Sequence, residues 1–150
     1  MIKYKGLSAI LIIISIVVIW RLLQPTEIIS IHANERRSNF NAIIRRPPLT
    51  DKGMMQWWQN NKVTLKEKYH VPLDERDYAI NFWVADYQTD SGGDLLCFED
   101  MPTSANCIDK ENNPLTVWYR HDVHHMVFFL NNGKTKYYKN TQTGQIRQVN

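Results

Sequence analysis

The stretch DYAINFWVADYQ, residues 77–88, contains the clearest strand in the chain. Tyr78, Ile80, Phe82 and Val84 alternate with more polar residues, and a side-chain period of two places all four on one face of a β-strand. Such alternation is typical of a sheet that buries one of its faces. The stretch therefore predicts a strand with one face in the core.

Similar short segments occur before and after this strand. They are residues 26–34, 40–45, 94–98, 115–120, 124–130, 134–139 and 145–149. The turn signals between them, such as Asn131-Asn132-Gly133, favour hairpins. We therefore expect a sheet whose strands are mostly antiparallel.

One segment of the domain has helical periodicity instead. Thr50 is a suitable N-cap for a helix that runs to about Lys68. The apolar stripe of this helix consists of Met54, Trp58, Leu65 and Tyr69. One helix among many short strands predicts an α+β domain, in which the helix packs on one face of a mostly antiparallel sheet.

The first 25 residues, MIKYKGLSAILIIISIVVIWRLLQP, have a different character. As a helix, residues 6–23 would reach roughly 27 Å, close to the hydrocarbon core of a bilayer. Bulky residues stand where a cleaved signal peptide needs small ones, which favours an uncleaved signal anchor, a transmembrane helix, over cleavage. Lys3 and Lys5 precede the apolar run and predict a cytoplasmic N-terminus. We therefore expect a single-pass protein of the bacterial inner membrane, with residues 1–25 as the anchor and residues 26–150 as a periplasmic domain.

Composition and charge restrict the class of partner. Hydrophobic residues make up 43% and charged residues 22% of the 150 residues, which is typical of a globular chain. The net charge of +3 comes from the N-terminal segment, because Lys3, Lys5 and Arg21 belong to it and the remaining 15 basic residues match 15 acidic ones. The balance predicts no nucleic-acid partner.

Both cysteines lie in LCFEDMPTSANCI, residues 96–108. In an oxidising compartment, Cys97 and Cys107 are most simply read as one disulfide, worth about 3 kcal/mol in the chain-entropy model. Free buried thiols, or a metal or redox site, are the alternatives. The spacing matches neither C-x-x-C nor a zinc knuckle.

Two groups of polar residues are candidates for metal chemistry, and each also has a simpler explanation. His121, Asp122 and His124 could supply zinc ligands, but His125 points away from His124 in an extended strand, and a solvated hairpin end explains the cluster equally simply. The carboxylates of a possible calcium loop are Asp86, Asp90 and Asp94. Their spacing is wrong for an EF-hand, and aspartate is an ordinary turn residue. We expect no cofactor.

Charged residues are also unevenly distributed. Residues 74–111 are strongly acidic, and Glu99 and Asp100 within them are candidates for binding a basic partner, although pairing with neighbouring basic strands is the simpler reading. Adjacent residues on a strand diverge, so a catalytic carboxylate pair is not expected there. The arginine pairs at 36–37 and 45–46, which are Arg36, Arg37, Arg45 and Arg46, could face anionic lipid headgroups.

Trp57 and Trp58 give the best indication of binding in the sequence. Neighbouring residues lie about 100° apart on a helix, so two adjacent tryptophans do not easily face one core. Core packing is the simpler explanation, but one of the two is a candidate interface anchor.

With these residues in view, the chain resembles a family of small enterobacterial inner-membrane proteins, domain of unknown function 943. The resemblance rests on the N-terminal apolar segment, LTDKGMMQWWQNNKVTLKEKYHVP (49–72), INFWVADY (80–87) and LCFEDMPTSANCI (96–108). It covers nearly the whole chain, and His70 stands where family members commonly have glycine. The resemblance implies an envelope location and supplies no catalytic residues.

No nucleophile–histidine–acid order, phosphate loop or dinucleotide fingerprint is present in the sequence. We therefore expect a non-enzymatic domain that binds another envelope protein, for example an immunity or accessory protein of a toxin acting at the envelope. An enzyme or metal-dependent factor that uses residues 121–125 is the alternative. A structural module at the membrane surface is a second alternative.

Overall fold

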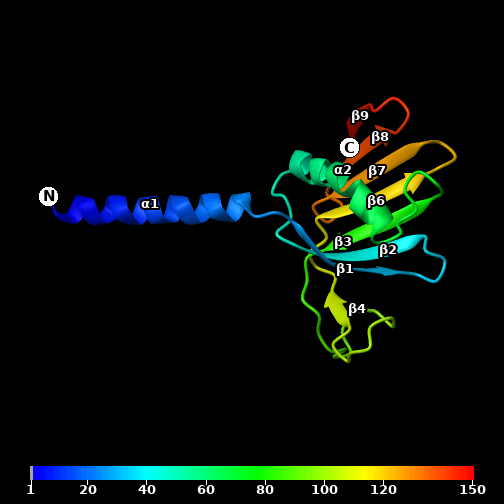
Figure 1. The fold of residues 1–150 in the computed structure, drawn as a ribbon, viewed down its shortest axis with the longest axis horizontal. Helices are drawn as coiled ribbons and strands as arrows, with labels where there is room; N and C mark the ends of the chain where they lie inside the picture. The colour runs from blue at the N-terminus through cyan, green and yellow to red at the C-terminus, as the bar shows by residue number, and fades with distance from the viewer. Residues whose placement is uncertain (1) are drawn as a thin grey trace.

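The computed structural model describes residues 2–150. Its first helix, α1 (Ile2–Leu23), extends away from the rest of the chain as a single rod (Figure 1). The segment Tyr4–Leu23 is long and apolar enough to cross a membrane, and none of it is buried in the protein. A membrane span and a signal sequence both fit this description.

Seven strands form one sheet, in the spatial order β1-β2-β3-β6-β7-β8-β9. They are β1 (Glu27–Ala33), β2 (Asn39–Arg45), β3 (Tyr78–Trp83), β6 (Leu115–Arg120), β7 (His125–Leu130), β8 (Thr135–Asn140) and β9 (Ile146–Val149). All neighbours are antiparallel except β2 and β3. These two are parallel because α2 (Asp51–Glu67) lies between them in the chain and serves as a crossover.

α2 begins where the sequence predicts. Thr50 is the N-cap, and its side-chain oxygen accepts a hydrogen bond of 3.0 Å from the backbone N–H of Gly53. The helix ends at Glu67, and His70 then adopts a φ of 56°. That left-handed conformation redirects the chain towards β3.

The main core lies between α2 and one face of the sheet. From α2 it receives Met54, Trp57, Trp58 and Leu65, and from the strands Phe40, Ala42, Ile44, Tyr78, Ile80, Phe82, Leu115, Val117, Tyr119, Met126, Phe128 and Leu130. Phe82 packs against both tryptophans, with ring centroids 5.2 Å from Trp57 and 6.0 Å from Trp58. The predicted α+β architecture, with one helix on a mostly antiparallel sheet, is confirmed.

A second, two-stranded sheet is formed by β4 (Leu95–Cys97) and β5 (Cys107–Asp109). We call residues 95–109 the arm. It lies on the side of the main sheet opposite α2 (Figure 1). Phe98 and Ile108 of the arm pack against Ile43 of β2 and make a second, smaller core.

The strand boundaries differ from the prediction in two places. The strand predicted over residues 77–88 ends at Trp83, because the backbone N–H of Val84 bonds the Asn112 carbonyl at 3.0 Å and the chain leaves the sheet there. β5 was not predicted, since three residues are too few for a visible period.

Candidate functional site

The face of the main sheet opposite α2 is only partly covered. The arm lies over the side chains around Ile43 and Trp83. Among the described residues, no helix or strand covers Trp118 of β6, and this residue is 52% exposed. We call the uncovered part, carried by β6, β7 and β8, the open face.

Pairing across the strands arranges the open face into three rows, the shortest of which consists of Arg120, His125 and Asn140. The first row consists of Ala79, Trp118, Val127, Tyr138 and Arg147. The second consists of Asn81, Thr116, Phe129 and Lys136. Directly opposed side chains on one face of an antiparallel pair lie about 5 Å apart, so each row is nearly continuous.

Aromatic rings and cations alternate on this surface. The rings of Trp118 and Phe129 meet edge to face, with centroids 4.8 Å apart. The Lys136 ammonium lies 5.4 Å from the Phe129 centroid, and the Arg147 guanidinium lies 5.6 Å from that of Tyr138. Such contacts hold cations over aromatic rings without neutralising them. The result is an aromatic surface with a cationic border along β8 and β9.

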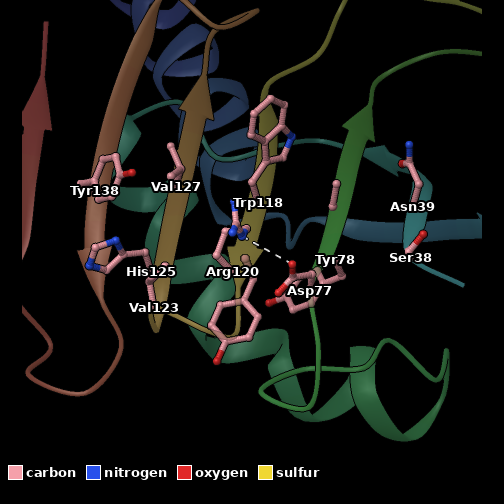
Figure 2. Close-up of a pocket in the computed structure, with 12 residues that line it drawn as sticks. Ser38, Asn39, Asp77, Tyr78, Trp118, Arg120, Val123, His125, Val127 and Tyr138 are labelled. Carbon is pink, nitrogen blue, oxygen red and sulfur yellow. Dashed lines mark ion pairs between the residues drawn. The ribbon is translucent and has the colours of Figure 1, made fainter.

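A hollow of about 590 Å³ opens on the first row (Figure 2). Trp118, Val127 and Tyr138 line it, together with the ion pair of Asp77 and Arg120 at 3.5 Å. Figure 2 shows these side chains on adjacent strands, with Arg120 between the aromatic residues and Asp77. The hollow thus combines apolar walls with one charged end.

Arg120 also holds Asp122, at 3.0 Å. The hydrogen bond from Arg120 lowers the pKa of the Asp122 carboxyl, and the same bond raises the pKa of the Arg120 guanidinium. Asp122 is therefore committed to Arg120 rather than turned towards a metal site with the histidines.

Of the predicted zinc ligands, His121 and His124 lie close together, but His125 lies apart from them. The rings of His121 and His124 lie 5.7 Å apart on the side of α2, whereas His125 lines the hollow of the open face. Of the calcium candidates, Asp90 accepts a hydrogen bond from the Gly92 N–H, and Asp94 pairs with Lys110 at 2.6 Å.

Among the described side chains, one group of three possible ligands lies close enough to share an ion: Asp90, Cys97 and Cys107. The two sulfurs of that group are bonded to each other, with an S–S distance of 2.07 Å. A disulfide leaves no thiolate for a metal.

The disulfide joins Cys97 to Cys107, as the sequence favours over free thiols. Cys97 and Cys107 face each other across β4 and β5. The backbone N–H and C=O of Cys107 bond Gln88 instead of Cys97, at 3.0 and 2.7 Å. The cysteines therefore form a non-hydrogen-bonded pair, in which the side chains are closest.

Neither Trp57 nor Trp58 reaches the surface, although one of them was expected to do so. Trp57 is 9% and Trp58 is 1% exposed. Both lie in the core and contact Phe82, so the expectation of an exposed interface anchor on α2 is wrong. Among residues 26–150, the exposed tryptophan is Trp118.

The surroundings of Glu99 differ from those of Asp100. Glu99 is exposed, whereas both carboxylate oxygens of Asp100 lie within hydrogen-bond distance of His32 Nδ1, at 2.9 and 2.8 Å. His32 Nε2 in turn lies 2.7 Å from the Tyr87 hydroxyl, which bonds that of Ser30. No sequence pattern predicts this network, because its members come from three distant segments.

The two arginine pairs lie at opposite ends of the β1–β2 hairpin. Arg36 and Arg37 are in its turn, away from α1, whereas Arg45 and Arg46 are beside α1 (Figure 1). Seven strand residues separate them, roughly 23 Å. If the hairpin points away from the membrane, only one of the two pairs can reach the layer of lipid headgroups. We therefore keep the expected headgroup contact for Arg45 and Arg46 alone.

Arg46 is partly used within the chain. Its guanidinium donates to the Pro25 carbonyl at 3.3 Å and to Glu27 at 3.2 Å, and its carbonyl accepts from the Thr26 hydroxyl at 2.7 Å. These bonds fasten the segment after α1 to the end of β2.

Comparisons with known proteins agree with this layout at the level of family. Residues 2–150 match the family model described as "Enterobacterial putative membrane protein (DUF943)". No curated protein and no solved structure matches the chain. Because the family model covers nearly the whole sequence, the chain belongs to this family of enterobacterial proteins.

Proposed function

We propose that this chain is a single-pass inner-membrane protein whose domain, residues 26–150, lies in the periplasm and binds another envelope protein through the open face. The observation that carries the proposal is the row of Trp118, Val127 and Tyr138, in which the exposed Trp118 lies beside two half-buried side chains on a rigid sheet. Aromatic residues on a preformed surface are the usual anchors of protein interfaces.

The tether and its direction have separate support. Two lysines at the start of α1 precede its apolar run, and no small-residue cleavage site follows that run, which favours an uncleaved anchor with a cytoplasmic start. The disulfide of Cys97 and Cys107 fits an oxidising compartment.

The partner should offer apolar or aromatic side chains bordered by acidic groups. Trp118 and Phe129 supply the apolar contact, and Lys136 and Arg147 keep their charges along one border. None of the ion pairs of the described residues involves either cation. An acidic border on the partner would complement them and speed association.

Binding fits this surface better than catalysis does. The charged groups in the hollow, Asp77 and Arg120, bond each other and are exposed. An immunity or accessory protein that holds a toxin at the envelope is one concrete form of the proposal, since such a role needs a tether and a binding face but no reactive group.

Crosslinking in intact cells tests the proposal. The wild-type chain, Trp118→Ala and Val63→Ala are treated with a short amine-reactive crosslinker and purified under denaturing conditions. Val63 is a matched control, because it is an exposed apolar residue on α2, away from the open face. We expect one discrete adduct in the wild type and in Val63→Ala, and its loss in Trp118→Ala. Equal adducts in all three chains, or none in any, would contradict the proposal.

A further inference from the structure

A second hollow, of about 470 Å³, lies on the α2 side of the sheet at the end farthest from α1. Its titratable side chains are Lys62, Asp74, Tyr119, His121, His124 and Lys139. They come from α2, the loop after it, the β6–β7 turn and β8. We call this hollow the cationic pocket.

The cationic pocket is separate from the open face. Lys139 lines it, whereas the preceding residue, Tyr138, lines the open face, because neighbouring strand residues point to opposite sides of a sheet. The two sites share Tyr119 in their linings, but their lysine, tyrosine and tryptophan side chains point to opposite sides of the sheet.

Hydrogen bonds hold the walls of the pocket in place. The backbone N–H and the hydroxyl of Thr141 both donate to the His124 carbonyl, each at 2.9 Å. The turn after β6 is thereby fastened to the turn after β8. A site joined in this way is formed before a ligand arrives, which lowers the cost of binding.

The charges in the pocket are unbalanced. Lys62 and Lys139 are cationic and close enough to repel each other, and Asp74 is the only acid lining the pocket. Neither lysine takes part in any ion pair of the described residues. Burial, and then the charge of Lys62, lower the pKa of Lys139, while Asp74 opposes the shift. The folded chain thus keeps two ammonium groups together with only partial compensation.

From this geometry we propose that the cationic pocket binds a phosphate group, either free or carried as a phosphomonoester. Lysine is a common point-charge ligand for phosphate, and the ring N–H groups of His121 and His124 can donate to its oxygens. The pocket is far from α1, so the phosphates of the lipids around α1 are out of its reach. It is also larger than one phosphate ion needs, which leaves room for a substituent.

The test uses the full chain in non-ionic detergent micelles. Backbone amide spectra are recorded while inorganic phosphate, or separately glycerol phosphate, replaces chloride at constant ionic strength. We expect saturable shifts in the turns around His124 and Thr141 and none around Phe129 and Lys136 of the open face. Tighter binding of glycerol phosphate assigns the site to a phosphomonoester, and tighter binding of inorganic phosphate assigns it to the free ion. Shifts that do not saturate for either would overturn the proposal.

Two substitutions of lysine sharpen this test. Lys139→Gln should weaken phosphate binding about tenfold or more, because one charged donor is lost. Lys134→Gln is the control, since Lys134 is exposed on the same hairpin and does not line the pocket. If Lys139 had only a structural role, Lys139→Gln would be less stable than the wild type. We expect this variant to be at least as stable as the wild type. Equal affinities in both variants would count against the site.

Discussion

The imidazole of His32 and the carboxylate of Asp100 are hydrogen-bonded although 68 positions separate them in the sequence. His32 is 7% exposed, and its ring stacks on Phe98 with centroids 3.9 Å apart. When Nδ1 donates to Asp100, Nε2 can accept from the hydroxyl of Tyr87. One side chain of β1 thereby fastens both the arm and the segment before it to the main sheet.

Replacing His32 should loosen the arm selectively. His32→Leu removes bonds to Asp100 and Tyr87 and the stack on Phe98, and we expect a loss of about 1–3 kcal/mol in the free energy of unfolding. Amides of the arm should exchange with deuterium faster than those of β6 and β7. His121→Leu, at an exposed histidine, serves as the control. Unchanged exchange in the arm would show that the network is not what holds it.

Tyr78 predicts a change of stability at alkaline pH. Among the described residues its buried hydroxyl has no hydrogen-bond partner, and burial, followed by the charge of Asp74, raises its pKa. The folded state therefore keeps the proton after the unfolded state begins to lose it near pH 10. Stability should be complete below that pH and fall as the pH rises above it.

Tyr78→Phe should weaken this pH dependence. At neutral pH the variant should be as stable as the wild type or about 1 kcal/mol more stable, because an unsatisfied buried group is removed. Burial also raises the pKa of Tyr119, so some dependence should remain. Denaturant unfolding between pH 7 and 11 measures both effects. An equally steep fall in the variant and the wild type would contradict the assignment.

Two tryptophans should respond to alanine in opposite ways. Trp57→Ala opens a cavity beside Phe82, and we expect a loss of about 3–5 kcal/mol. Trp118→Ala removes a half-exposed side chain and its contact with Phe129, which should cost no more than about 1.5 kcal/mol. Unfolding in denaturant compares them directly. A loss at Trp118 as large as that at Trp57 would mean that Trp118 is a core residue.

The cysteines report on both the disulfide and the topology. In intact cells, a bulky maleimide should label neither Cys97 nor Cys107 until a reductant is added, and then both after unfolding. The gel shift gives the number of labelled thiols. A chain of which both thiols react without reduction would contradict either the pairing or the periplasmic location of the domain.

Much of the fold can be predicted because local patterns agree with it. The alternation predicted within residues 77–88 is reproduced over Tyr78–Trp83, and so is the capping by Thr50. Trp57 was harder to predict, because the width of a buried helix face depends on what it packs against. α2 lies over the bulky Phe82, which packs against both tryptophan rings, so both are buried.

The candidate site could not be predicted for a related reason. Trp118 and Val117 occupy adjacent positions in an apolar strand, and the sequence does not show which of the two faces stays uncovered. That depends on where the arm docks, and docking is decided by long-range contacts such as that of Ile43 with the arm. The cysteine spacing predicts the loop but not its place on the sheet.

The most direct test of the account is a photocrosslink from a defined position of the full chain in its own cell envelope. A photoreactive phenylalanine analogue replaces Val127 on the open face or, as a control, Val63 on α2. We predict one discrete protein adduct from position 127, absent from position 63 and lost when Trp118→Ala is added. The same adducts from both positions, or none from position 127, would contradict binding through the open face.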